Sequence, residues 1–432
     1  MWSRWSGGVI AAMVAIALCA GFAVKVVDAP HSFPSPVNSQ PTGPSVVPGR
    51  TLRAALAAAV TFDPKPGAVD VALDGRVVVN ANAGRLTAVR AVTTTKWPLF
   101  GTLSASGKRW QSSGPLVPGI SYQVTATVSG SAGVAATATS TFRTVTPVAT
   151  VTATVFPDGL TVGVAQPIVI RFDHLITTEA ARTAVLQRFT VTESRPVPGG
   201  WHWFNNRELH LRPQLYWPVG EKVTVTSDLN GWNAGNGMWG GGTTRAQFTI
   251  GNAHVAVANL ATHQMTVSDN GRLIATYPFS GGRDMYPTMN GVHIVLDRES
   301  VVHMVSSTNG IPVNSPDGYD ELVYSDVHIT DSGEYVHAAP WSVDSQGRDN
   351  VSHGCINLSP ADAFAFFGFS RVGDVVWVVG GPRPPAQGDH GVMDWETKWS
   401  DWTPAVVHNM FPPPAAKPRA PARAAPRSEE RR

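Results

Sequence analysis

Cys355 has the strongest case for chemistry among the residues of this chain. The 432-residue sequence contains two cysteines, and the other, Cys19, lies in an apolar N-terminal segment. The two are therefore not expected to form a structural disulfide. A thiol that is idle in an exported protein is a liability, so a thiol kept there is expected to be used. We interpret Cys355 as a nucleophile.

A nucleophilic thiol needs a base within hydrogen-bond reach, and imidazole is well suited to this role. His353 is two residues from Cys355 and is held too rigidly on the same backbone to be the obvious base. His337 is eighteen residues upstream and can face Cys355 from a neighbouring strand. Gly354 leaves room for a substrate carbonyl, and the N–H groups of Gly354 and Cys355, with His353, are candidate oxyanion donors.

The pattern H-(x)14-S-H-G-C-I-N, which runs from His337 to Asn357, resembles the signature of the L,D-transpeptidases with a YkuD-type catalytic domain. The resemblance implies a cysteine acyl-enzyme that joins peptidoglycan stem peptides, with β-lactams, especially carbapenems, as inhibitors. It also implies that the backbone carbonyl of Ala338 orients the base. No cofactor and no metal are expected.

Two other interpretations of these residues remain open. A lone cysteine is often a small buried apolar residue. A zinc site is the second alternative, but its candidate ligands lack the short paired spacing of structural zinc sites. These candidates are His303, His328, His337, His353 and Cys355.

The segment from Met304 to Tyr319 is polar and rich in glycine and proline, so it is predicted to be an irregular loop. It resembles the flap that covers the substrate cleft in the family, and a disordered surface loop is the alternative. The residues expected to contact substrate are Met304, Tyr319, Trp341, Ser352 and Asn357.

Several local signals predict the elements that position this site. Residues 263–277 are expected to form a hairpin around Asn270 and Gly271. Residues 286–295 resemble a family segment that leads into a core strand. Ser359 is predicted to cap a helix that starts with Pro360.

Two regions upstream, 51–146 and 147–250, show short alternating runs and turns that predict β-sandwiches. In the first region, the runs at 121–128 and 134–142 with a glycine-rich break between them predict a hairpin. In the second region, one helical interruption is expected between Thr178 and Arg188. Both resemble the immunoglobulin-like domains that precede the catalytic domain in mycobacterial L,D-transpeptidases. Neither contains a cluster of titratable groups in its sequence. They are therefore expected to be spacers or binding modules.

The rest of the chain completes a mainly β architecture. Its predicted parts are a signal anchor or signal peptide at 1–27, a Pro-rich linker at 28–50, the catalytic domain at 251–382, a C-terminal extension at 383–409 and a disordered tail at 410–432. Within the extension, Trp395, Trp399 and Trp402 are expected to line one face of a short helix that packs on the domain surface. The anchor predicts an extracytoplasmic protein held at the cell membrane and facing the cell wall.

Composition gives no case for nucleic-acid binding, because the formal net charge is +2 and the last sixteen residues alone contribute a net charge of +4. The predicted function is the formation of 3-3 cross-links from a tetrapeptide donor. L,D-carboxypeptidase activity uses the same residues and stays open, as does a non-enzymatic wall-binding protein. Papain-like endopeptidases place the cysteine before the histidine, which is the reverse of the order here.

Overall fold

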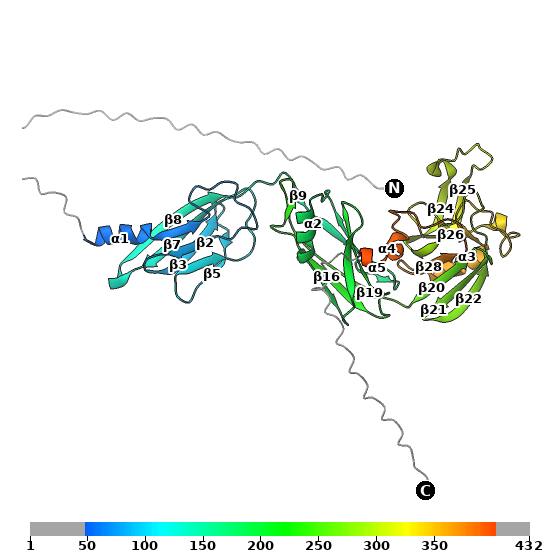
Figure 1. The fold of residues 1–432 in the computed structure, drawn as a ribbon, viewed down its shortest axis with the longest axis horizontal. Helices are drawn as coiled ribbons and strands as arrows, with labels where there is room; N and C mark the ends of the chain where they lie inside the picture. The colour runs from blue at the N-terminus through cyan, green and yellow to red at the C-terminus, as the bar shows by residue number, and fades with distance from the viewer. Residues whose placement is uncertain (1–47, 403–432) are drawn as a thin grey trace, which may run out of the picture. The chain divides into compact units, whose positions relative to one another are not determined.

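Strands form most of the regular structure in residues 48–402, the part of the chain that this computed structural model describes (Figure 1). The prediction of a mainly β protein is confirmed. The cause is visible in β7 (Ser121–Ser129), where every second side chain is buried. Successive side chains of a strand point to opposite faces, so such alternation leaves one face for a core.

The first β-region contains two four-stranded sheets, in the orders β1-β2-β6-β5 and β4-β3-β7-β8. The predicted hairpin is confirmed, because β7 pairs with β8 in continuous antiparallel register. The remaining elements are β1 (Val60–Asp63), β2 (Val78–Ala81), β3 (Arg85–Thr93), β4 (Pro98–Leu99), β5 (Gly101–Leu103), β6 (Arg109–Ser112), η1 (Ser131–Gly133) and β8 (Ala135–Arg143).

One helix was not predicted: α1 (Pro48–Ala58) begins in the predicted linker and ends in the predicted first β-domain. Its run of alanine and leucine has high helix propensity. Pro48 lies at the first position, where its missing N–H removes no intrahelical hydrogen bond.

The second β-region has two four-stranded sheets, β10-β12-β15-β14 and β11-β19-β16-β13, and a small sheet β17-β18-β9. The predicted helical interruption is α2 (Glu179–Val185) with η2 (Leu186–Arg188). The strands are β9 (Thr150–Val151), β10 (Ala153–Phe156), β11 (Thr161–Val162), β12 (Ile168–Phe172), β13 (Phe189–Glu193), β14 (Gly199–Trp203), β15 (Glu208–Pro213), β16 (Lys222–Asp228), β17 (Asn233–Gly235), β18 (Met238–Gly240) and β19 (Thr243–Ile250).

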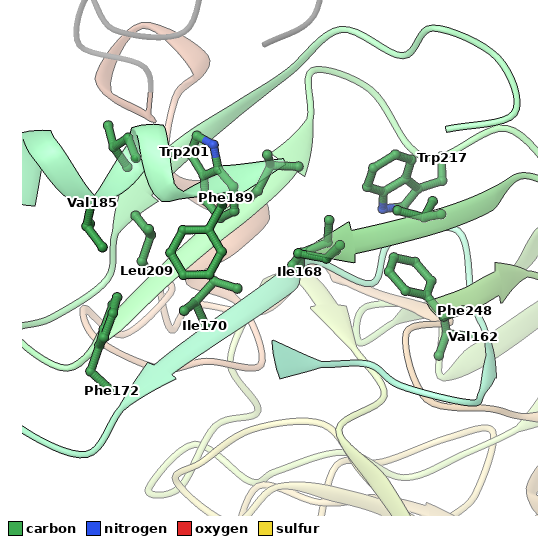
Figure 2. Packing of buried hydrophobic residues seen from close by; sticks show 14 of the residues in the cluster. Val162, Ile168, Ile170, Phe172, Val185, Phe189, Trp201, Leu209, Trp217 and Phe248 are labelled. Atoms are coloured by element: carbon green, nitrogen blue, oxygen red, sulfur yellow. The ribbon is translucent and has the colours of Figure 1, made fainter. Parts of the chain in front are cut away.

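Aromatic and branched side chains fill the core of this second region (Figure 2). Phe172 packs edge-on to Phe189 with ring centroids 6.4 Å apart, and Phe189 contacts Trp201 at 5.6 Å. Burying one such side chain contributes roughly 1.5–3 kcal/mol. The same cluster includes Ile294 and Val375 of the catalytic region, so the two regions share buried surface.

The catalytic region contains a five-stranded sheet, β22-β21-β20-β28-β23, and a four-stranded sheet, β24-β25-β26-β27. The predicted Asn270-Gly271 hairpin is confirmed, with both turn residues at positive φ. The elements are β20 (His254–Asn259), β21 (Gln264–Asp269), β22 (Arg272–Pro278), β23 (Gly291–Ile294), β24 (Asp297–Val305), β25 (Asp320–His328), β26 (Tyr335–Ala338), β27 (Ile356–Leu358), α3 (Pro360–Phe369) and β28 (Val375–Val379).

The predicted start of α3 is confirmed, because Ser359 Oγ accepts a hydrogen bond from the Asp362 N–H at 3.2 Å. The predicted irregular loop is shorter than expected. Met304 lies in β24, and the turn η3 (Ser306–Asn309) follows it. The Ser306 N–H donates to the Tyr319 carbonyl at 2.9 Å, which closes the base of this flap.

The C-terminal extension forms two short helices, α4 (Met393–Glu396) and α5 (Trp399–Trp402), where the sequence predicted one. Thr397 separates them in extended conformation. The Trp395 indole N–H donates to the Ala165 carbonyl and that of Trp402 to the Gly200 carbonyl, both at 2.9 Å. The tryptophans therefore pack on the second β-region rather than on the catalytic region that precedes them in sequence.

The predicted anchor, most of the Pro-rich linker and the C-terminal tail lie outside the described residues. Within residues 48–402, none of the helices has both the length and the apolar character needed to cross a membrane.

Candidate active site

One pocket of about 370 Å³ gathers most of the residues that the sequence predicted to act together. It is bordered by β25, β26, the turn η4 (Pro340–Ser342) and the segment before β27. The predicted residues that line it are Cys355, His337, His353, Met304, Tyr319, Trp341, Ser352 and Asn357. Gly354 and Ala338 lie directly beside lining residues in the chain.

Strand pairing brings His337 and Cys355 to the same place. β26 and β27 are parallel neighbours, with His337 opposite Asn357. Cys355 comes two residues before Asn357, immediately ahead of β27. Adjacent strands lie about 4.8 Å apart. This register therefore places Cys355, just before β27, close to β26, which carries His337. Residues eighteen positions apart in sequence thus line one pocket.

His337 is held as a neutral imidazole. Its Nδ1 lies 3.0 Å from the Ala338 carbonyl oxygen, which can only accept, so Nδ1 carries the proton and Nε2 keeps a lone pair. The side chain is buried, and this desolvation lowers the pKa of His337 to about 4. The imidazole is therefore uncharged at neutral pH.

Cys355 is held as a neutral thiol. Desolvation raises the pKa of Cys355 to about 12, and the nearby carboxyl groups of Glu334 and Asp326 act in the same direction. The sulfur lies 3.9 Å from the Gly333 carbonyl oxygen. Because the neutral thiol and the neutral imidazole line the same pocket, proton transfer is expected to accompany nucleophilic attack instead of preceding it.

Replacing Ala338 with serine tests whether the carbonyl alone orients the base. The carbonyl is kept in this variant, so we expect the rate of Cys355 acylation to change by no more than about twofold. Stopped-flow or mass-spectrometric acylation kinetics measure this. A gain of tenfold or more would show that a side-chain hydroxyl contributes to orientation.

The turn around the nucleophile differs from the expected oxyanion hole. The Gly354 N–H donates to Ser352 Oγ at 3.1 Å, and the Ser352 hydroxyl donates to the Cys355 carbonyl at 2.6 Å. The Gly354 N–H is thus engaged, which leaves the Cys355 N–H as the backbone donor for an oxyanion. Ser352 fixes the turn through these two bonds, in addition to lining the pocket. Gly354 has φ 131°, a conformation that disfavours any side chain.

His353 is also engaged elsewhere. Arg283 Nη2 donates to His353 Nε2 at 3.0 Å, and the same guanidinium pairs with Asp317 in the flap. The ring of Tyr319 lies 5.0 Å from that of His353 between centroids. In this structure His353 therefore joins the flap to the nucleophile turn, and its ring is not directed to the expected oxyanion role.

The substrate-contact candidates surround the pocket from several elements. Trp341 is 55% exposed, with its ring 6.1 Å from that of His337. Asn357 is buried, and its Nδ2 donates to Ser342 Oγ at 3.2 Å, while its Oδ1 has no hydrogen-bond partner. A buried acceptor that faces a pocket without a partner is available to a ligand N–H.

Sequence reasoning missed several lining residues. Glu321 and Val323 follow Tyr319 at a spacing of two along β25, so strand alternation could have found them. Gly318, Ser342, Ser345 and Val351 carried no comparable signal. Glu334 was missed as well; it lies behind Gly354, and burial raises its pKa to about 7 despite its ion pair with Arg383.

The residues of the zinc alternative do not come together as one metal centre. His303 pairs with Asp320 at 2.5 Å, and His328 pairs with Asp297 at 3.2 Å, both away from the pocket lining. Among residues 48–402, the group with suitable metal-ligand separations is Glu208, His210 and His390.

Comparison with known proteins gives two family matches. Residues 68–233 match the bacterial Ig domain, and residues 253–378 match the L,D-transpeptidase catalytic domain. The chain is 41% identical over 337 residues to L,D-transpeptidase 2 of Mycobacterium tuberculosis, which covers 78% of this chain and 82% of that protein.

Two further proteins illustrate the extent of the similarity. L,D-transpeptidase 5 of M. tuberculosis is 33% identical over 379 residues, or 84% of this chain and 79% of that protein. A solved LD transpeptidase in complex with imipenem is 38% identical, with a TM-score of 0.47, over 54% of this chain and 100% of that chain.

Proposed function

Because the chain belongs to the L,D-transpeptidase family, we propose that it forms 3-3 cross-links between peptidoglycan stem peptides through an acyl-enzyme on Cys355. The observation that carries this proposal is the parallel pairing of β26 with β27. Because of this pairing, His337 and Cys355 line the same pocket. The similarity to L,D-transpeptidases 2 and 5 favours transfer over hydrolysis and over wall binding alone.

The first half-reaction consumes the donor stem, a tetrapeptide. Cys355 Sγ attacks the carbonyl carbon of the L-centred third residue while His337 Nε2 takes the thiol proton. The Cys355 N–H donates to the developing oxyanion. The peptide bond then breaks, and the departing D-alanine amine receives the proton from His337. A thioester on Cys355 remains.

The second half-reaction restores the enzyme. An amine of the acceptor stem attacks the thioester carbonyl and gives its proton to His337 as the new amide bond forms. The carbon–sulfur bond breaks, and His337 returns the proton to Cys355. Each proton taken by His337 is thus released within the same half-reaction.

The flap and the wall residues have a positioning role in this proposal. Met304 and Tyr319 border the pocket from the flap side, and Trp341 borders it beside the base. Asn357 Oδ1 is placed to accept a stem-peptide N–H. The Arg283 contacts with His353 and Asp317 hold the flap over the nucleophile turn.

A β-lactam is a strained acyl donor, so the same thiol is proposed to open the lactam ring and form a thioester. Carbapenems are the class that the family resemblance implies.

The proposed peptidoglycan substrate also leads us to propose that the chain works outside the cytoplasm, held at the membrane by its N-terminal segment and facing the cell wall.

Mass spectrometry of the chain incubated with a tetrapeptide stem tests the proposal. We expect an adduct on Cys355 that has lost D-alanine, followed by cross-linked dimer. Tripeptide without dimer would replace transfer by hydrolysis. The absence of any adduct on Cys355, in protein that retains its fold by circular dichroism, would overturn the cysteine mechanism.

A further inference from the structure

A second pocket, of about 380 Å³, lies where the second β-region meets the catalytic region and the C-terminal extension. None of its lining residues lines the active-site pocket. Arg171 and His210 border it from the β-region, and Asp331, His390 and Asp394 border it from the other side. Histidines and carboxylates thus gather at a junction that the proposed reaction does not use.

Three potential ligand atoms converge here. Glu208 and His210 are separated by one residue in β15, so both side chains point to the same face. His390 lies between β28 and α4 and approaches that face from the C-terminal extension. Their ligand atoms all lie within 4.8 Å of one another, and Glu208 and His210 are buried. His390 Nε2 forms a short hydrogen bond directly to Glu208 Oε2.

Each histidine is oriented by a carboxylate on its far nitrogen. His210 Nδ1 lies 2.9 Å from Asp394 Oδ1, and His390 Nδ1 contacts Asp331 Oδ2. A carboxylate that accepts from Nδ1–H fixes the orientation of the ring, which is the arrangement behind metal-bound histidines. In His210 this leaves Nε2 with a lone pair, whereas His390 Nε2 carries the proton that it donates to Glu208 Oε2. Arg171 Nε lies 2.5 Å from Glu208 Oε1, while Oε2 accepts hydrogen bonds from Asn205 Nδ2 at 3.1 Å and from His390 Nε2. Oε2 is therefore the carboxylate oxygen on the side of the two histidines.

An unpaired buried nitrogen points to a ligand at this place. His210 is 1% exposed, and its Nε2 has no hydrogen-bond partner. That atom lies 3.9 Å from Glu208 Oε2, so its lone pair is directed into the cluster. Buried polar atoms nearly always have partners, and an exception needs an explanation such as a bound ion.

We propose that Glu208 Oε2, His210 Nε2 and His390 Nε2 bind one Zn²⁺ ion. Two imidazoles and a carboxylate are a common ligand set for zinc, with bonds of about 2.0–2.2 Å and a fourth position for water. The adjoining pocket gives that water access. Zinc takes the place of the proton shared by His390 and Glu208, which is released to solvent on binding.

Such a site joins three parts of the chain. Glu208 and His210 belong to the second β-region, and His390 belongs to the C-terminal extension. Asp331 belongs to the loop that continues to Gly333, whose carbonyl oxygen contacts Cys355. The ion therefore acts as a structural clamp at the junction and leaves the chemistry to Cys355. The rival explanation is that hydrogen bonds among Asp331, His390 and Glu208 hold the junction without a metal.

The test uses the full chain with Cys355→Ala, because this change removes the active-site thiol as a competing zinc ligand. After chelator treatment and removal of the chelator, Zn²⁺ is titrated against a chromophoric competitor. We expect one equivalent to bind, with Kd at or below about 1 µM, and His390→Gln to weaken binding by more than about 100-fold. His390 is partly exposed, so this variant is expected to fold. His174→Gln, at a partly exposed histidine of the same β-region, should bind like the parent.

Two further measurements separate the site from incidental binding. Asp394→Asn is expected to weaken Zn²⁺ binding by about 10–100-fold, because it loosens the orientation of His210 without removing a ligand. Added Zn²⁺ should raise the Tm of the parent but not that of His390→Gln. Failure of the parent to bind Zn²⁺, or binding that His390→Gln and His210→Ala both leave unchanged, would overturn the proposal in favour of the metal-free hydrogen-bond network.

Discussion

Cys355→Ala is expected to abolish cross-link formation, with a loss on the order of 10⁴-fold or more in the turnover rate. The variant removes the atom that forms the thioester, and no other cysteine lies in the described residues. The side chain is small, so the fold should persist. Quantification of cross-linked dimer by liquid chromatography and mass spectrometry measures the effect.

A matched pair of variants makes this test sharper. Cys355→Ser keeps a nucleophilic atom of similar size but replaces the thiol by a much less reactive hydroxyl, so it should also be inactive. Neither variant should form a covalent adduct with a carbapenem. Retained cross-linking by folded Cys355→Ala protein would contradict the acyl-enzyme and require another nucleophile.

His337→Gln is expected to slow acylation of Cys355 by about 10²–10⁴-fold while leaving the thiol in place. Burial raises the pKa of Cys355 to about 12, so few molecules carry a thiolate at neutral pH without help from a base. Single-turnover acylation by a carbapenem measures this step directly. His174→Gln serves as the control because His174 is partly exposed and lies in the second β-region. Equal rates for His337→Gln and the parent would show that His337 is not the base.

The pH dependence of the same rate follows from the lowered pKa of His337. An ordinary histidine near pKa 6.5 becomes protonated as the pH falls through that value, and a protonated base cannot accept the thiol proton. Because burial lowers the pKa of His337 to about 4, acylation should hold its rate down to about pH 5.

Two neighbouring carboxyl groups need control variants in this measurement. Burial raises the pKa values of Glu334 and Asp326 to about 7, and both groups act electrostatically on Cys355. An inflection near pH 7 that disappears in Glu334→Gln or Asp326→Asn therefore belongs to those groups. An inflection near pH 6.5 that persists in both variants would contradict a neutral, desolvated His337.

Local sequence patterns were sufficient for much of the fold. Alternation predicted β7 and β8, the Asn270-Gly271 pair predicted the β21–β22 hairpin, and Ser359 with Pro360 predicted the start of α3. Each of these signals acts between residues that are close in sequence, so the local sequence is enough to predict the element. The helix α1 was missed because its alanine-rich run was assigned with the strands that follow it.

The candidate site was predictable to the extent that it is a contiguous motif. The sequence placed Cys355, His337 and the flap in one site, and the structure lines one pocket with them. It could not reveal that Ser352 engages the Gly354 N–H, or that Arg283 and Asp317 engage His353. Hydrogen-bond partners depend on which backbone and side-chain groups lie within reach in the folded turn. Only the tertiary structure determines these positions.

By itself, the sequence determined a mainly β architecture and predicted a nucleophile and its base, because each rests on short-range spacing or on residue type. Only the tertiary structure decided which side chains meet at the junction of the second β-region, the catalytic region and the C-terminal extension. The second β-region showed no titratable cluster in its sequence, yet β15 brings Glu208 and His210 to one face, and His390 reaches them from 180 residues further along the chain. Trp395 and Trp402 pack on the second β-region and hold the C-terminal extension there. This contact depends on the burial of apolar surface between parts of the chain that are far apart in sequence, so no local sequence pattern predicts it.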